Sequence, residues 1–182
     1  AYPDMVGFGR RSMALSRDAI IANLHYQVAA LEGMAQSQGL DLAYVKPHGA
    51  LYHDMMTQDE VRAAIFHAIA SYHRPLALMI QATVQADAHR REAQEAGVTL
   101  LLEAFADRCY DDDGRLVHRS QPGAVHSRQR MLDQVQQLRQ DSSVTTLNGH
   151  IIPLQVDSLC VHGDNPEGVN SIEAIRALIG GT

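Results

Sequence analysis

The sequence is short of several residue types, and each shortage narrows the protein classes that fit it. It contains no tryptophan, two cysteines and a single lysine among 182 residues. Two cysteines cannot form the disulfide framework of a small secreted protein, so a reducing, cytoplasmic setting is expected. No apolar run approaches the roughly 18 residues of a membrane span, and no signal-peptide pattern opens the chain. The net charge of -6 and the scattered arginines argue against nucleic acid as a partner.

What remains is typical of a soluble α/β protein. The chain is 46% hydrophobic and 20% charged, which is far from the composition of a disordered protein. Apolar residues at spacings of three to four predict a first helix over 17–38, with Ile20, Ile21, Leu24, Val28, Leu31 and Met34 on its buried face. Further helices are predicted over 58–72, 84–96, 127–139 and 172–179, and strands over 42–45, 76–80, 98–105 and 159–161. Strands that alternate with helices indicate βαβ units and a parallel sheet.

Both an open doubly wound sheet and a closed (β/α) barrel fit this alternation. A barrel usually needs about 250 residues, so a chain of this length lacks about two βα units. The opening Tyr2-Pro3-Asp4 is typical of the middle of a loop, which agrees with a missing N-terminal part. We therefore expect residues 1–182 to form a single domain that is truncated at its N-terminus.

Polar side chains follow several of the predicted strands. Binding sites of parallel α/β folds lie at the carboxyl ends of the strands, and residues two apart on a strand share a face. The candidates that this rule selects are Lys46 and His48, then Glu103, Asp107 and Arg108, then His162 and Asp164. They are expected to converge on one mouth of the fold.

Lys46 is notable because every other basic residue apart from the histidines is an arginine. A lysine after a strand is most often a solvated surface residue. A sequence that uses arginine everywhere else has no need of lysine for that purpose. The alternative is a compact ammonium group that a guanidinium cannot replace.

The other candidates also have structural alternatives. Glu103 lies among leucines, so it is either a structural ion-pair partner of Arg108 or Lys46 or a carboxylate with a shifted pKa at a site. His48 fits either a loop hydrogen bond or a site. His162 and Asp164 fit an acid/base or metal pair, or a turn in which Asp164 caps the following helix. Cys160 is expected to be buried and inert, and Cys109 to lie nearer the mouth.

Familiar metal and nucleotide motifs are missing from the sequence. It has no HExxH or CxxC pattern, so no metal site is predicted from these residues alone. It also has no GxxxxGK[ST] pattern, so any nucleotide would bind without a Walker motif.

Four motifs, in this order, resemble the LamB/YcsF family over residues 1 to about 166. They are AYPDMVGFGRRSM, VKPHGALYHDM, EAFADRCYDDDGRLVHRSQPGA and CVHGDNP. That family is identified with the A subunit of 5-oxoprolinase. The resemblance implies an irregular seven-stranded (β/α) barrel similar to the polysaccharide-deacetylase barrels. It also implies ATP-dependent hydrolysis of 5-oxo-L-proline to L-glutamate in a complex with subunits B and C.

The reaction that the resemblance implies suggests roles for residues on which the family motifs fall. Lys46, His48, Glu103, Asp107 and His162 are expected to be catalytic, and Arg108, Asp164, Tyr52 and Arg10 to bind substrate. His53 stands where the family usually has asparagine. The acidic and histidine motifs of the family's N-terminal part are missing, so a metal would need ligands from that part. The alternatives are a metal-dependent, deacetylase-like amidase that acts alone, a non-catalytic subunit that binds 5-oxoproline, and a scaffold subunit.

Overall fold

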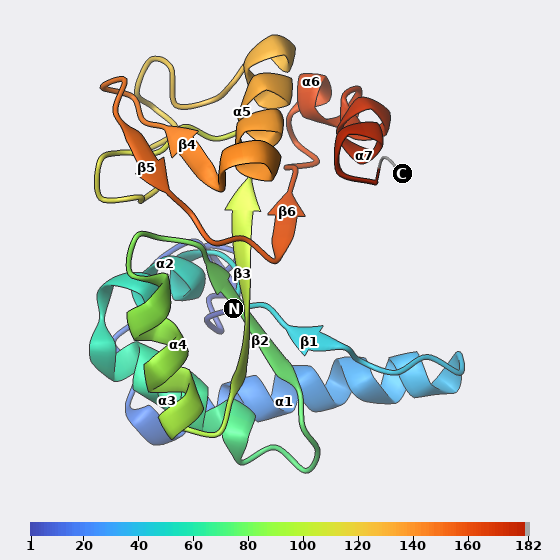
Figure 1. Cartoon of the computed structure of the whole chain (residues 1–182). Coiled ribbons are helices and arrows are strands. Elements are labelled where there is room, and N and C mark those ends of the chain that lie inside the picture. The colour runs from blue at the N-terminus through green and yellow to red at the C-terminus, as the bar shows by residue number, and fades with distance from the viewer. Residues whose placement is uncertain (181–182) are drawn as a thin grey trace. The chain divides into compact units, whose positions relative to one another are not determined.

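A computed structural model describes residues 1–180, and these form an α/β fold (Figure 1). The helices are α1 (Arg17–Ser37), α2 (Ala50–Thr57), α3 (Asp59–Ala70), α4 (Ala86–Glu95), α5 (Arg128–Asp141), α6 (Pro166–Val169) and α7 (Ile172–Gly180). The strands are β1 (Tyr44–Val45), β2 (Ala77–Gln81), β3 (Thr99–Phe105), β4 (Ser143–Thr145), β5 (Ile151–Pro153) and β6 (Ser158–Cys160). The chain divides into two compact units, of which unit 1 comprises residues 1–80 and 87–101 and unit 2 comprises residues 81–86 and 102–180.

Unit 1 is built on parallel strands in the order β1, β2, β3. Tyr44 lies opposite Ala77, and Val45 lies opposite Leu78. Strand β2 is buried along most of its length, which explains why its sequence, ALMIQ, is almost wholly apolar. Its side chains join a core with residues of α2 and α3 that include Met55 and Ile65.

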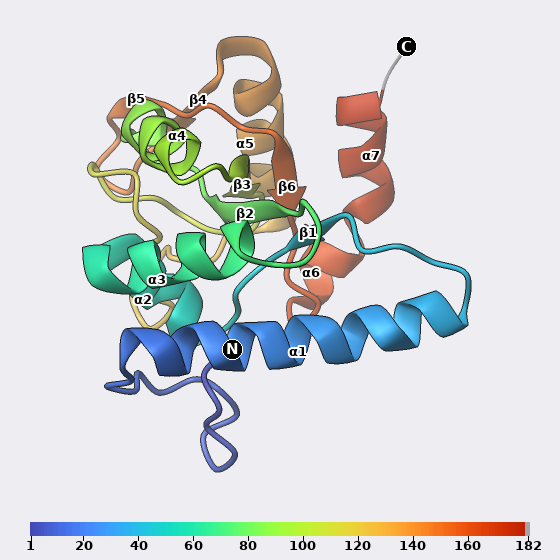
Figure 2. The ribbon, with the colours of Figure 1, turned by 90° about the horizontal axis from the view of Figure 1, so that it is seen from below.

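Helix α1 lies alongside α3 in unit 1 (Figure 2). The Ser16 side chain caps its first turn by accepting a hydrogen bond from the Ala19 backbone. Gly39, with φ of 71°, ends the helix because Leu40 then bonds back to Ala35. The predicted apolar face is only partly confirmed. Ile20, Leu24, Val28 and Glu32 are buried, whereas Leu31 and Met34 are 58% and 65% exposed.

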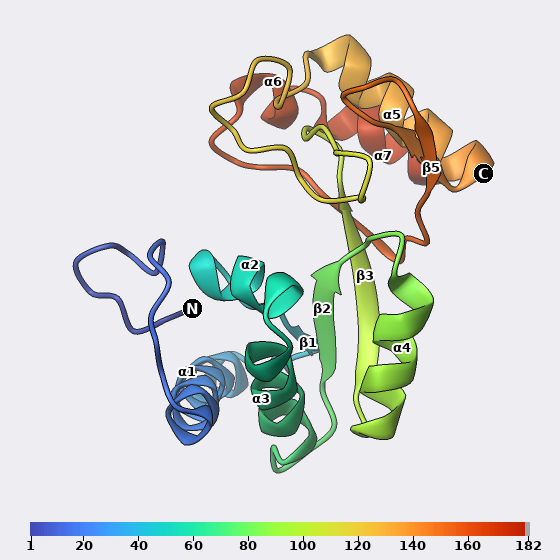
Figure 3. The same ribbon diagram turned by 90° about the vertical axis from the view of Figure 1, so that its left-hand side faces the viewer.

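In unit 2, the last residues of β3 pair in parallel with β6. Helices α5 and α7 pack together (Figure 3), around a core of Ala106, Val135 and Ile175. Strands β4 and β5 form an antiparallel pair beside α5. Because β3 and β6 are parallel neighbours, the residues that follow them leave the sheet on the same edge.

The structure confirms the predicted parallel α/β class, with differences in local detail. The strand predicted at 42–45 is reduced to Tyr44–Val45, and the helix predicted at 58–72 spans Asp59–Ala70. Helix α2, helix α6 and the β4–β5 pair were not predicted. Each of these is short, and periodicity is a weak signal over so few residues. Within residues 1–180, no helix is long and apolar enough to cross a membrane.

Candidate functional site

The carboxyl ends of β3 and β6 bring Asp107 and His162 together in unit 2. Phe105 and Cys160 lie opposite each other in the parallel pair, and Asp107 and His162 each follow two residues later. The Nδ1 atom of His162 lies 2.9 Å from Oδ1 and 3.0 Å from Oδ2 of Asp107. The imidazole stacks on the Phe105 ring with the ring centroids 5.4 Å apart. Two residues predicted from separate strands thus form one contact pair.

The ionisation state of Asp107 determines which nitrogen of His162 carries the proton. Asp107 is 1% exposed. Burial opposes ionisation of its carboxyl group, but the hydrogen bond and charge of His162, together with a hydrogen bond of Asn165, outweigh it, so the pKa of Asp107 is below its ordinary value. An ionised carboxylate only accepts hydrogen bonds, so Nδ1 of His162 carries the proton. In the neutral ring, Nε2 then holds the lone pair and can accept a proton.

Arg108 lies beside this pair, but its side chain turns to the protein backbone. It is buried, and its Nη2 donates to the Val117 carbonyl oxygen at 2.5 Å. Burial, assisted by the positive charge of Arg119, lowers the pKa of the Arg108 guanidinium. Its Nε atom has no hydrogen-bond partner among residues 1–180. Arg108 thus retains one donor that is not used within the described chain.

Glu103 is buried on β3 in unit 2, as predicted. It lies opposite Ser158 in the β3–β6 register. Its charge contributes to the raised pKa of the Tyr110 hydroxyl, although burial of Tyr110 is the main cause. Glu103 therefore belongs to the buried part of unit 2 near Tyr110, and a catalytic role for it stays a prediction.

Asp164 does not cap a helix, so that alternative was wrong. The N-cap of α6 is Asn165, and the Asp164 carboxylate instead accepts a hydrogen bond from Arg119 Nη1 at 2.8 Å. Both side chains are largely exposed. This ion pair lowers the pKa of Asp164.

The position of Cys109 near the mouth stays a prediction. Cys109 is completely buried, and this burial raises the pKa of its thiol, which is the opposite of what a nucleophilic cysteine needs. Cys160, expected to be buried, is half-buried.

Unit 1 holds a second group of predicted residues around the end of β1. Lys46 is half-buried, and its Nζ lies 5.7 Å from the centroid of the Tyr52 ring, which is a cation–π distance. His48 and Arg10 are exposed in the same unit. The ammonium group of Lys46 thus lies over the ring of Tyr52, which is on α2.

Gly49 connects this group to the N-terminal loop. Its φ is 62°, and a Cβ there would lie 2.2 Å from the Gly9 carbonyl oxygen. That same oxygen accepts a hydrogen bond from the Ala50 backbone at 2.9 Å. The glycine allows a close approach of two backbones, which sets Arg10 beside the loop that carries Lys46 and His48.

Buried acids that the sequence did not reveal hold the N-terminal loop in place. Asp4 accepts hydrogen bonds from Arg11 and from the Gly7 backbone. Asp54, on α2, accepts hydrogen bonds from Tyr2 at 2.9 Å and from Ser12 at 3.0 Å. The available signal for Asp54 was its position on the same helix face as Leu51 and Met55, both of which are buried.

A metal cluster is not found in either group. Within the described residues 1–180, no three His, Cys, Asp or Glu side chains are grouped so that they could hold a metal ion.

Comparisons with known proteins agree with each other. The family model described as LamB/YcsF family matches residues 1–181. A Chromohalobacter salexigens protein, named as the A subunit of 5-oxoprolinase, is 46% identical over 100% of this chain and 73% of its own length. A Pseudomonas fluorescens protein with that name is 45% identical, over 98% of this chain and 72% of its own. A lactam utilization protein from Thermus thermophilus has a crystal structure with a TM-score of 0.86 and 33% identity, covering 98% of this chain and 72% of that one.

Proposed function

The chain belongs to the LamB/YcsF family, and from this membership we propose that it is the A subunit of an ATP-dependent 5-oxoprolinase. In this proposal a cytoplasmic complex of A, B and C subunits hydrolyses 5-oxo-L-proline to L-glutamate. The names of the relatives support the assignment. The alternation of parallel strands and helices also supports the finer proposal of a seven-stranded (β/α) barrel in one domain.

The reaction opens a five-membered lactam, and each atom in it is accounted for. Water adds its oxygen to the amide carbon, the carbon–nitrogen bond breaks, and the nitrogen becomes the amino group of glutamate. ATP, a second substrate, activates the amide by phosphorylating its oxygen and leaves as ADP. Breaking the carbon–nitrogen bond then gives an acyl phosphate, and a second water hydrolyses it to the free carboxylate and phosphate. The sequence has no Walker motif, so the proposal assigns ATP binding to the assembled complex.

The hydrogen-bonded pair of Asp107 and His162 is the observation that carries the proposal. A base must remove a proton from the attacking water, and a positioned histidine is the most frequent group for this task. Nε2 of His162 holds the free lone pair, and Asp107 fixes the ring and stabilises the positive charge that follows proton uptake. The His162 side chain is 25% exposed, so water can reach it.

Lys46 is proposed to supply positive charge. The amide oxygen gains negative charge as water attacks, and a cation aimed at that oxygen stabilises the transition state. The Tyr52 ring lies under the ammonium. A planar guanidinium distributes its charge differently, so arginine at this position is expected to be a poor replacement.

Glutamate formation from 5-oxo-L-proline and ATP tests the proposal. The full-length protein would be assayed with its B and C partners, beside the Lys46→Arg and His162→Gln variants. We expect turnover only with all three components, and a loss of kcat in both variants. Variants that bind the substrate more weakly with unchanged kcat would instead indicate a purely binding role. No turnover by the complete, folded assembly would overturn the function.

A further inference from the structure

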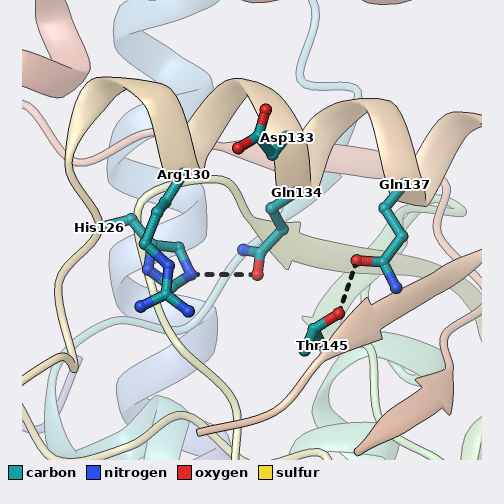
Figure 4. A pocket seen from close by; sticks show the side chains of 6 residues that line it. All are labelled: His126, Arg130, Asp133, Gln134, Gln137 and Thr145. Carbon is teal, nitrogen blue, oxygen red and sulfur yellow. Dashed lines mark hydrogen bonds between the residues drawn. The ribbon is translucent and has the colours of Figure 1, made fainter. Parts of the chain in front are cut away.

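Helix α5 presents a polar face to the β4–β5 side of unit 2. Arg130, Asp133, Gln134 and Gln137 recur at spacings of three and four, which places them on one side of the helix. They line a cavity of about 230 Å³ together with two further polar residues. Figure 4 shows the complete set, which is His126, Arg130, Asp133, Gln134, Gln137 and Thr145. A cavity with only polar residues in its lining is expected to attract a polar ligand.

The hydrogen bonds of Gln134 determine which nitrogen of His126 is protonated. The side-chain nitrogen of Gln134 lies 2.8–3.3 Å from the carbonyl oxygens of Phe105, Ala106 and Arg108, so it must be the amide donor. Its oxygen, Oε1, therefore accepts from Nε2 of His126 at 3.1 Å. In the neutral ring, Nδ1 of His126 then holds the lone pair. This Nδ1 has no hydrogen-bond partner within residues 1–180.

The charges around His126 favour its neutral form. His126 is 5% exposed, and this burial lowers the pKa of its ring. The positive charges of Arg130 on α5 and Arg108 after β3 lower it further, against the hydrogen bond of Gln134 and the charge of Asp107. Within the described residues 1–180, no ion pair of Arg130 is observed. The lining therefore holds the exposed Arg130 guanidinium and the Asp133 carboxylate next to a buried imidazole whose pKa is lowered.

We propose that this cavity binds the carboxylate group of a small organic acid, with Arg130 as the anion-binding residue. A guanidinium presents paired N–H donors that match the two oxygens of a carboxylate. Figure 4 shows the Arg130 side chain directed to the same side of α5 as Gln134, and the Asp133 carboxylate turned away from their side. Ligand pockets usually enclose about 300–1,000 Å³, so this smaller cavity suits an acid of a few carbon atoms.

A carboxylate fits this cavity better than a phosphate group. Arg130 is the single permanent positive charge of the lining, and repulsion from the Asp133 carboxylate disfavours a dianion more than a monoanion. The Thr145 hydroxyl donates to Gln137 Oε1 at 3.0 Å, which leaves the lone pairs of the hydroxyl oxygen for a donor group on the acid. The site would therefore favour an acid that also carries an N–H or O–H group.

Binding and protonation of His126 should be coupled. A bound carboxylate cancels the charge of Arg130, which removes one of the influences that keep His126 neutral. The acid should therefore raise the pKa of His126, and by reciprocity it should bind more tightly as the pH falls. The link is electrostatic, and it requires no direct contact between the acid and the imidazole.

An NMR titration of the whole chain tests the proposal without any measurement of turnover. The ring signals of His126 would be followed during addition of acetate, 5-oxo-L-proline or inorganic phosphate. We expect saturable shifts with the two carboxylates, a higher pKa of His126 in their presence, and weaker shifts with phosphate. Arg130→Gln should weaken binding by about tenfold or more because it removes the charge-assisted hydrogen bonds. Arg139→Gln, in the last turn of the same helix, should not weaken it.

Three results would overturn the inference. They are the absence of saturable shifts with either carboxylate, equal binding by the Arg130→Gln and Arg139→Gln variants, and a preference for phosphate. Because the readout is binding to the chain alone, its failure would leave the proposed 5-oxoprolinase activity untouched. Loss of that activity in the assembly would likewise leave the cavity as proposed.

Discussion

The imidazole of His162 donates its Nδ1 proton to the buried carboxylate of Asp107, at 2.9 Å from Oδ1. The two residues are 55 positions apart in the chain, yet they follow neighbouring parallel strands in the same register. The register of the two strands therefore brings these two positions close together, whichever side chains they carry. It leaves Nε2 of His162 as the proton acceptor.

Asp107→Asn should retain the fold and lose activity. An asparagine can present its N–H group to Nδ1, which favours the tautomer with the proton on Nε2 and removes the base. We expect kcat to fall by about 10²–10⁴-fold, the usual contribution of general base catalysis. The assay is glutamate formation by the complete assembly, with Asp141→Asn at the exposed end of α5 as a control. Unchanged kcat in Asp107→Asn would contradict the assigned role.

Gln134→Leu should destabilise unit 2. Gln134 is buried, and its side-chain amide nitrogen donates hydrogen bonds to the carbonyl oxygens of Phe105, Ala106 and Arg108. Leucine is similar in size but leaves these acceptors unpaired, and an unpaired buried polar group costs roughly 1–3 kcal/mol. Urea unfolding would measure the loss.

Gln136→Leu is the matched control because Gln136 is an exposed neighbour on the same helix. Equal unfolding midpoints for the Gln134→Leu and Gln136→Leu variants would show that the carbonyl contacts do not stabilise the loop around Asp107.

The sequence predicted the parts of the site that depend on chain order. Residues after parallel strands share one edge of a sheet, so Asp107 and His162 could be placed near each other from their positions alone. Lys46 could be selected because it is the single lysine. Its contact with Tyr52 could not, because α2 is a helix of eight residues whose pattern is too short to identify.

The buried polar residues could not be predicted, for a different reason. Asp54, His126 and Gln134 are stabilised by partners that only the folded chain brings near. A polar residue on the buried face of a helix, such as Gln134 beside Met131 and Val135, is a signal of a buried hydrogen-bond network. The sequence does not reveal which carbonyl groups or rings complete that network.

Gly49→Ala should be much more harmful than Gly33→Ala. At Gly49, a Cβ would collide with the Gly9 carbonyl oxygen, and the positive φ adds strain. At Gly33, within α1, a Cβ meets nothing within 4 Å, and alanine is favoured over glycine in a helix by about 0.8–1.0 kcal/mol. We therefore expect a lower melting temperature for Gly49→Ala and a higher one for Gly33→Ala. Similar shifts for the two variants would refute the close backbone approach.

Glu32 should make the stability of unit 1 depend on acid pH. It is buried on α1 and accepts hydrogen bonds from Tyr72, His73 and Arg74. The hydrogen bond of His73 and then those of Arg74 and Tyr72 lower the pKa of Glu32 from 4.5 to about 2, against the opposing effect of burial. A lowered pKa in the folded state means that the ionised carboxylate stabilises the fold.

This contribution should be complete above the unfolded pKa of 4.5 and should be lost as the pH falls towards about 2. Urea unfolding at pH 6 and pH 3 would compare the native chain with the Glu32→Gln variant, and with Glu60→Gln in the first turn of α3 as the matched control. The native chain and the control should lose stability on acidification, and Glu32→Gln should lose less because it has no carboxyl group to protonate. An identical loss in all three proteins would mean that the hydrogen bonds to Glu32 do not favour its ionised form.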